Sequence, residues 1–249
     1  MNYNEKTISI EISQIKSITI FILSIVIFLS AIILWRQQRF DNSILINCNY
    51  FFEKAIYHNF FKFISRYGMS LIALSYSILI FLLFRNNSLS HNKTMFMFIL
   101  FSFGIGSISG DIMKEIVDRS RPVIELSGVL SQTELSDTPS FPSGHTVKSM
   151  SLALPFVIMA LNRDSITKVF KIIVLSLAIL VSISRIALQK HYLSDILAGI
   201  AVALFFMLIA VYIANGIYKR GNIDEMKIAQ MNKRFGFVFT GLAVLLCII

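Results

Sequence analysis

The stretch IIVLSLAILVSISRIALQKHYLSDILAGIAVALFFMLIAVYIANGI, residues 172–217, contains two apolar runs separated by a short polar segment. The second run, Ile196–Ile217, is long enough to cross the hydrocarbon core of a bilayer as a helix, and the first, Ile172–Ile183, becomes long enough when its flanks are included. The segment between them, Ser184–Asp195, holds an arginine, a histidine and an aspartate. Ionisable groups so close to a bilayer are costly, so this segment is a candidate functional site.

The rest of the chain has the same membrane-like character. Of its 249 residues, 55% are hydrophobic and 15% are charged, and the mean hydropathy is +0.71. A soluble domain carries about 25% charged residues, and its apolar residues follow amphipathic patterns instead of long runs. Six apolar runs are predicted to span the membrane: Ser17–Leu34, Tyr67–Phe84, Thr94–Gly110, Thr146–Leu161, Ile172–Ile183 with its flanks, and Ile196–Ile217. The sequence therefore predicts an all-α, polytopic membrane helical bundle with about six transmembrane helices, in a single domain over residues 1–249.

The formal net charge of +9 fits contact with anionic lipid headgroups better than contact with nucleic acid. The Lys and Arg residues divide almost evenly between the two predicted sides, so the positive-inside rule gives only a slight preference for cytoplasmic termini. We expect an integral protein of a bacterial inner membrane, with its polar clusters facing the periplasm or the exterior. The lipid bilayer is the expected partner, and no obligate protein partner is indicated.

Three further segments are interpreted from their length and periodicity. The first run, Ser17–Leu34, is longer than the apolar core of a signal peptide and has no clear cleavage site, so a retained span is expected. The last run, Phe235–Ile249, is short for a span and predicts either a tilted seventh helix or an interfacial segment. Aromatic and apolar residues recur at helical spacing over residues 52–67, which indicates an amphipathic helix either in the membrane interface or packed on the bundle.

Three polar clusters are predicted to lie on the same side of the membrane. They are KEIVDRSRP (residues 114–122), SFPSGHT (residues 140–146) and SRIALQKHYLSD (residues 184–195). Each cluster adjoins an end of a predicted span, so the folded bundle is able to bring all of them together.

The first property of these clusters is an excess of cations. Lys114 and Arg121 are two helical turns apart, and Arg185 comes from another loop. Converging cations repel one another unless a multiply charged anion lies between them, and phosphate oxygens match guanidinium forks and a lysine point charge. Ser143 and Gly144 precede a predicted helix, whose free N–H groups and dipole favour an anion. These residues therefore predict a phosphate site.

The second property is a set of groups suited to phosphoryl transfer. His191 and Asp195 have an i, i+4 spacing, so the aspartate is able to accept a hydrogen bond from one ring nitrogen and leave the other as a nucleophile. His145 is the available general acid for the leaving oxygen. No metal or other cofactor is expected, because a phosphohistidine on His191 followed by attack of water completes a hydrolysis, and the only cysteines, Cys48 and Cys247, do not have metal-type spacing.

Each feature also has an ordinary structural interpretation. A lone histidine is more often a hydrogen-bonding core residue than a catalyst, and Ser-Gly is common turn chemistry. Arg119 and Lys148 are interpreted as headgroup anchors or as charges behind the site. Asp118 is expected to be a local partner of Arg121 or Arg119.

Taken together, the clusters resemble the signature of the type 2 phosphatidic acid phosphatase (PAP2) superfamily, in its membrane lipid phosphatase branch. The signature motifs lie within residues 114–195 and are Lys114…Arg121-Pro122, Pro142-Ser143-Gly144-His145, and Ser184-Arg185…His191…Asp195. The resemblance implies that His191 is the nucleophile, that Asp195 orients it and that His145 is the general acid. It also implies that five residues hold the phosphate: Lys114, Arg121, Ser143, Gly144 and Arg185. Vanadium haloperoxidases share this constellation, but they are larger soluble proteins.

The leading functional hypothesis is a metal-independent phosphatase, a phosphoric monoester or diphosphate hydrolase, that acts on a lipid at the extracytoplasmic face. Envelope lipids are favoured, such as lipid A (1- or 4'-phosphate) or undecaprenyl diphosphate, because the basic, aromatic segment Trp35–Arg66 suits a large anionic headgroup. Phosphatidic acid and phosphatidylglycerol phosphate are alternative substrates. A lipid-to-lipid phosphotransferase and a non-catalytic lipid-phosphate binder or transporter are alternative functions, and the two histidines with Asp195 count against the binder.

Overall fold

The computed structural model describes residues 13–52, 54–85, 95–122, 138–159, 165–221 and 225–248. Within these ranges the chain forms eight α-helices and no strand, which confirms the all-α fold. The helices are α1 (Gln14–Arg36), α2 (Gln38–Phe52), α3 (Ala55–Arg85), α4 (Met95–Val117), α5 (Gly144–Met159), α6 (Ser165–Ala187), α7 (Leu193–Gly221) and α8 (Glu225–Ile248).

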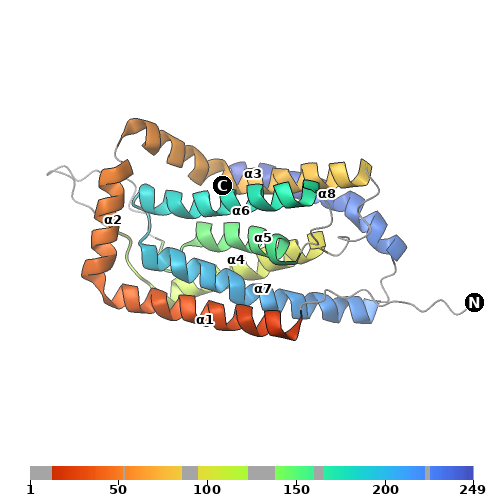
Figure 1. The fold of residues 1–249 in the computed structure, drawn as a ribbon, viewed down its shortest axis with the longest axis horizontal. Coiled ribbons are helices and arrows are strands. Elements are labelled where there is room, and N and C mark those ends of the chain that lie inside the picture. The colour runs from red at the N-terminus through yellow and green to blue at the C-terminus, as the bar shows by residue number, and fades with distance from the viewer. Residues whose placement is uncertain are drawn as a thin grey trace, which may run out of the picture.

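The long helices lie lengthwise in a bundle, and α2 lies across one end of it (Figure 1). Helix α5 is central and packs against α4, α6 and α7, while α1 covers α7 and α3 packs against α6 and α8. A fully buried aromatic cluster joins several of these helices: the ring of Tyr76 lies 5.4 Å from that of Phe156 and 5.0 Å from that of Phe239. The Tyr76 hydroxyl donates to the carbonyl of Leu152 at 2.7 Å, so this buried polar group is satisfied.

Five of the described helices are long and apolar enough to cross a membrane: α1, α3, α4, α6 and α7. The predicted fourth span lies on α5, which has 16 residues and is shorter than the other five. The predicted C-terminal segment is part of α8, where the apolar stretch Arg234–Cys247 is also short for a span and packs on α3. The arrangement is that of an integral membrane protein.

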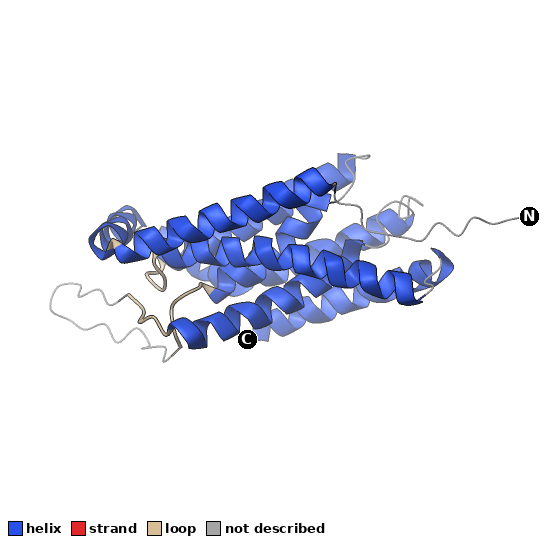
Figure 2. Ribbon diagram, turned by 90° about the horizontal axis from the view of Figure 1, so that it is seen from below, coloured by secondary structure: helices blue, strands red, loops and turns tan. Residues whose placement is uncertain are grey.

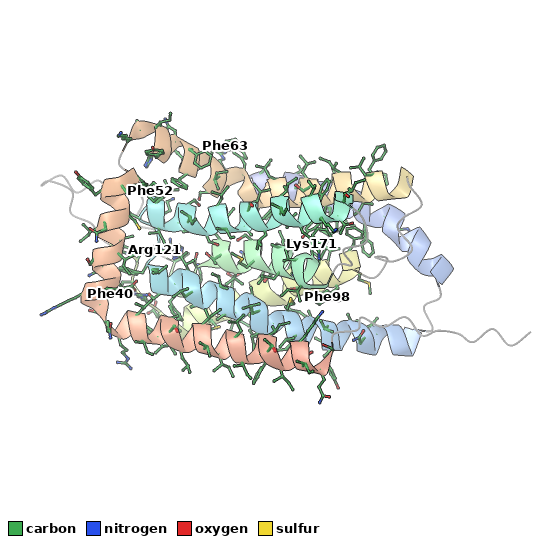
Figure 3. The ribbon with its side chains drawn as sticks, in the orientation of Figure 1. Phe40, Phe52, Phe63, Phe98, Arg121 and Lys171 are labelled. Carbon is green, nitrogen blue, oxygen red and sulfur yellow. The ribbon has the colours of Figure 1, made fainter. Side chains whose placement is uncertain are left out.

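The amphipathic segment at residues 52–67 differs from its sequence-based interpretation as one helix. Helix α2 ends at Phe52, and α3 begins at Ala55 and continues without interruption into the predicted second span. No glycine or proline occurs between residues 55 and 67 to end the helix there, so its first turns simply extend the span. Figure 3 shows Phe52 and Phe63 on these two helices.

Three loops meet at the end of the bundle where α2 lies, and they cover residues 118–122, 138–143 and 188–192. Figure 2 shows loops gathered at this end, and hydrogen bonds join the three to one another. These loops carry or adjoin all three polar clusters of the sequence. The bundle thus brings the predicted site residues to one end of the molecule.

Candidate active site

The loop that carries His191 is folded back onto the end of α6. Lys190 and His191 donate their backbone N–H groups to the carbonyl of Arg185, at 2.9 and 3.2 Å. Gln189 allows this reversal by adopting a left-handed conformation with φ of 57°. Arg185 and His191 therefore come from one compact turn and have a fixed relation to each other.

His191 and Asp195 form the predicted pair, and a serine joins them. The Nδ1 atom of His191 lies 3.4 Å from Oδ2 of Asp195, and both side chains are almost completely buried. The Ser140 hydroxyl donates to Oδ2 of Asp195 at 2.5 Å and lies 3.3 Å from Nδ1 of His191. The backbone N–H of Tyr192 also donates to Oδ2, at 3.0 Å. The carboxylate oxygen that faces the histidine is thus held by several donors.

The other ring nitrogen of His191 faces a cation. Its Nε2 atom lies 3.4 Å from Nη1 of Arg121. A guanidinium is only able to donate, so Nε2 is the acceptor and carries the lone pair, while Nδ1 carries the hydrogen toward Asp195. This is the tautomer that a nucleophilic Nε2 requires.

Burial keeps His191 neutral. Burial lowers the pKa of His191 to about 4; the positive charges of Arg185 and Arg121 also lower it, and Asp195 acts in the opposite direction. The imidazole is therefore uncharged at neutral pH, and its lone pair is available for attack.

The three predicted cations lie near one another, and two of them, Arg121 and Arg185, act electrostatically on His191. Lys114 is in the last turn of α4 and interacts electrostatically with Arg121 and Arg185, which repel it. Arg121 is held by Thr138, through its carbonyl at 3.0 Å and its hydroxyl at 2.9 Å. Such an accumulation of positive charge is favourable only when an anion compensates for it.

Arg185 is the most buried of these cations. Its side chain is 5% exposed, and Nη1 donates to the hydroxyl of Ser65 on α3. Its Nε atom is buried and has no hydrogen-bond partner among the described residues. An unpaired buried donor on a charged group costs free energy, so it indicates a place where an acceptor from a ligand binds.

The PSGH motif lies at the start of α5, as predicted. The backbone N–H of Ser143 donates to the carbonyl of Asp195 at 3.0 Å, which fixes α5 to α7. A Cβ atom on Gly144 would lie 3.4 Å from Cε and Nζ of Lys114, so glycine leaves room for the lysine beside the helix N-terminus. His145, the predicted general acid, is close enough to Arg185 and to the pair's His191 to interact electrostatically with both.

Arg119 is not a headgroup anchor but a charge behind the site. Its side chain is buried, and it donates to Oδ1 of Asp195 at 2.6 Å and to Oδ2 of Asp41 at 3.1 Å. The described contacts of Arg119 and Arg121 do not include Asp118, which ends α4 in a left-handed conformation with φ of 45°. Lys148 lies 3.7 Å from Asp111, its partner on α4.

Three contributors were not identified from the sequence: Ser140, Ser65 and Asp41. Ser140 belongs to the SFPSGHT cluster, but serine is common in turns, and only the fold directs its hydroxyl to Asp195. Ser65 and Asp41 belong to segments far from the motifs, and no spacing connects them to the site. In the part of the chain that the structure describes, no group of three or more His, Cys, Asp or Glu side chains is arranged to hold a metal ion.

Comparison with known proteins places this site in a family context. Residues 95–219, which include all three motifs, match the family model of the PAP2 superfamily. No curated protein matches the chain. The fold is similar to a crystal structure described as the first transmembrane PAP2 type phosphatidylglycerolphosphate phosphatase from Bacillus subtilis. The two chains are 21% identical over 82% of this chain and 96% of the other, with a TM-score of 0.52.

Proposed function

The chain belongs to the PAP2 superfamily of phosphatases, and from this premise we propose that it hydrolyses a lipid phosphate through a covalent intermediate on His191. The observation that carries the proposal is the buried Nε of Arg185, which has no hydrogen-bond partner among the described residues, on a guanidinium that acts electrostatically on the neutral His191. A phosphoryl group bound between Arg185 and His191 would accept a hydrogen bond from Nε of Arg185 and lie within reach of Nε2 of His191.

The reaction has two steps that balance in atoms and charge. In the first, Nε2 of His191 attacks phosphorus, the bond from phosphorus to the lipid oxygen breaks, and His145 gives that oxygen a proton, which it holds once the negative charge of the bound phosphate offsets the surrounding cations. In the second, His145 takes a proton from water, the water oxygen attacks phosphorus, and the phosphorus–nitrogen bond breaks. Inorganic phosphate leaves and both histidines return to their starting states. Asp195 stabilises the positive charge that develops on the imidazole.

The three cations supply the electrostatic part of catalysis. In the proposed complex Lys114, Arg121 and Arg185 surround the phosphoryl oxygens, where charge builds up. Lys114 lies beside Gly144 at the N-terminus of α5, whose free N–H groups and dipole also favour an anion. Because these groups already provide fixed positive charge, the proposed mechanism is independent of a metal ion.

A lipid substrate is favoured by the place of the site in the bundle. The site lies at the end of a membrane bundle, next to α2 (Figure 1). At this end, Arg36 in the last turn of α1 and Arg39 in the first turn of α2 are exposed. A cavity of about 250 Å³ adjoins Arg119 behind Asp195 and has an aromatic and polar lining; it is lined by Trp35, Gln38, Asn42, Arg119, Ser120 and Tyr192. We therefore favour an envelope lipid with a large anionic headgroup, of the lipid A or undecaprenyl diphosphate type, with the site at the extracytoplasmic face.

The direct test is release of inorganic phosphate by the purified protein in detergent with EDTA. The panel contains lipid A, undecaprenyl diphosphate, phosphatidylglycerol phosphate and phosphatidic acid, each assayed beside the variant His191→Ala. We expect release that persists in EDTA and is lost in the variant. Faster release from a glycerophospholipid than from either envelope lipid would contradict the proposed substrate class. Transfer to an added acceptor lipid, without free phosphate, would indicate a phosphotransferase.

A further inference from the structure

Arg119 lies between two buried carboxylates that come from distant parts of the chain. Its Nη1 atom donates to Oδ1 of Asp195 at 2.6 Å, and its Nη2 atom donates to Oδ2 of Asp41 at 3.1 Å. Its guanidinium lies over the ring of Tyr192, 4.1 Å from the centroid, and 5.4 Å from that of Trp35. These contacts fix the plane of the guanidinium, because stacked aromatic rings and two carboxylates leave it little freedom.

Asp41 is the more unusual partner, because it lies on α2. Its side chain is fully buried, and besides Arg119 it accepts hydrogen bonds from the backbone N–H of Ser194, at 3.3 Å, and from the Ser194 hydroxyl. That hydroxyl also lies 2.6 Å from Nη1 of Arg119. Asp41 thus connects α2 to the first turn of α7, immediately before Asp195.

The orientation of Asp195 depends on this network. Arg119 occupies Oδ1, so the carboxylate presents Oδ2 to His191, where Ser140 and the backbone of Tyr192 also donate. If Arg119 rotated, the carboxylate would lose the contact that sets which oxygen faces the imidazole.

The net charge of the groups behind His191 also depends on Asp41. One guanidinium charge is shared between two carboxylates, so a net negative charge remains available to the imidazole. With Asp41 neutral, Arg119 would compensate Asp195 alone, and the developing positive charge on His191 would be less stabilised.

We propose that Asp41 is a positioning residue of the reaction, acting through Arg119 on the catalytic Asp195. This inference rests on the proposed function, because it takes His191 as the nucleophile that Asp195 orients. Asp41 lies outside residues 95–219, the range that carries the family motifs, and it makes α2 part of the active site.

The test compares two substitutions of the same kind, Asp41→Asn and Asp118→Asn. Asp118 is next to Arg119 in the sequence, but it is exposed, so it controls for the loss of one negative charge at this end of the molecule. We expect Asp41→Asn to lower kcat by about ten- to a hundredfold, as small displacements of a catalytic group do. The KM for the lipid and inhibition by inorganic phosphate should change by less than about threefold, since the cations that hold phosphate are untouched.

A double-mutant cycle distinguishes an action of Asp41 through Asp195 from a merely structural role of Asp41. Asp41→Asn is combined with Asp195→Asn, whose residual turnover sets the reference. If Asp41 acts through Asp195, it should lower kcat in the wild-type background and have little further effect in the variant. An equal loss in both backgrounds, or turnover of Asp41→Asn equal to that of Asp118→Asn, would overturn the inference.

Two further measurements separate a loss of catalysis from a loss of folding. Asp41→Asn preserves the size of the side chain, and a monodisperse detergent complex with cooperative thermal unfolding shows that the variant is folded; Asp41→Glu, which retains the charge, should recover part of kcat. Failure of the proposed function has a different signature, because wild type would then release no phosphate or His191→Ala would remain active.

Discussion

Replacing Ser140 by alanine removes one donor from the catalytic pair without touching the pair itself. The hydroxyl donates to Oδ2 of Asp195 at 2.5 Å and lies 3.3 Å from Nδ1 of His191, and its side chain is fully buried. Water has no ready access to replace it, so Asp195 would present an uncompensated lone pair. We expect the histidine to lose part of its alignment and the carboxylate to be held less firmly.

The magnitude follows from the kind of hydrogen bond that is lost. A hydrogen bond to a charged group contributes about 1.5–3 kcal/mol, and each 1.4 kcal/mol lost in the transition state is about tenfold in rate. Asp195 keeps three other donors, from Arg119, Tyr192 and His191. We therefore expect the lower part of this range for Ser140→Ala, a decrease in kcat of about ten- to thirtyfold with little change in KM.

The assay is steady-state phosphate release from the lipid that the wild type hydrolyses fastest. Ser182→Ala is the matched control, because Ser182 is also buried but its hydroxyl donates to the carbonyl of Ala178 in its own helix, at 2.9 Å. A kcat for Ser140→Ala within about twofold of the control would refute the role given to Ser140. A rise in KM at unchanged kcat would place Ser140 in substrate binding instead.

Three other outcomes are expected. Arg185→Lys should lose about ten- to a hundredfold in kcat/KM, because a point charge does not replace the guanidinium fork. Ser65→Ala should lose less, because it removes only one hydrogen-bond partner of that guanidinium. A kcat/KM of Arg185→Lys equal to that of the wild type would exclude Arg185 from phosphate binding. Burial lowers the pKa of His191 to about 4, so the nucleophile is unprotonated above that pH. The kcat/KM should therefore persist below pH 6.5 and fall as the pH approaches 4, and a fall in kcat/KM centred at pH 6.5 would contradict this. Gly199→Ala should lower the free energy of unfolding by about 1–3 kcal/mol, since its Cβ would lie 2.9 Å from Cβ of Thr146 in the first turn of α5. Gly216→Ala, whose Cβ would meet nothing within 4 Å, should leave it unchanged.

The convergence of the cations was predictable from the sequence. Lys114, Arg121 and Arg185 each adjoin the end of an apolar run, and alternating spans bring those ends to one side of a membrane. The contact of His191 with Asp195 was also predicted from their spacing, although His191 lies in the loop before α7 begins at Leu193. The backbone N–H of Tyr192, which donates to Oδ2 of Asp195, holds this loop against the carboxylate. Local periodicity and span counting suffice for such features.

The contributions of α2 and α3 were not predictable in the same way. Asp41 is separated from Arg119 by 78 positions, and a single aspartate in a mixed segment carries no signal that it becomes fully buried. Periodicity identified a helix over residues 52–67 but not its direction, so it left open an interfacial helix or one packed on the bundle, whereas α3 extends the second span from Ala55. The choice depends on tertiary packing, such as the close contact between Gly68 and Val181 on α6.

The most direct test of the mechanism is to trap the phosphorylated enzyme. Wild-type protein is mixed with the fastest lipid of the panel in EDTA, quenched in alkali within the first turnover, and digested for mass spectrometry, with His191→Ala as the control. We expect a phosphoryl group on His191 that forms and decays at rates compatible with kcat, and none in the variant. Turnover without any adduct on His191, or an adduct on another residue, would contradict the account.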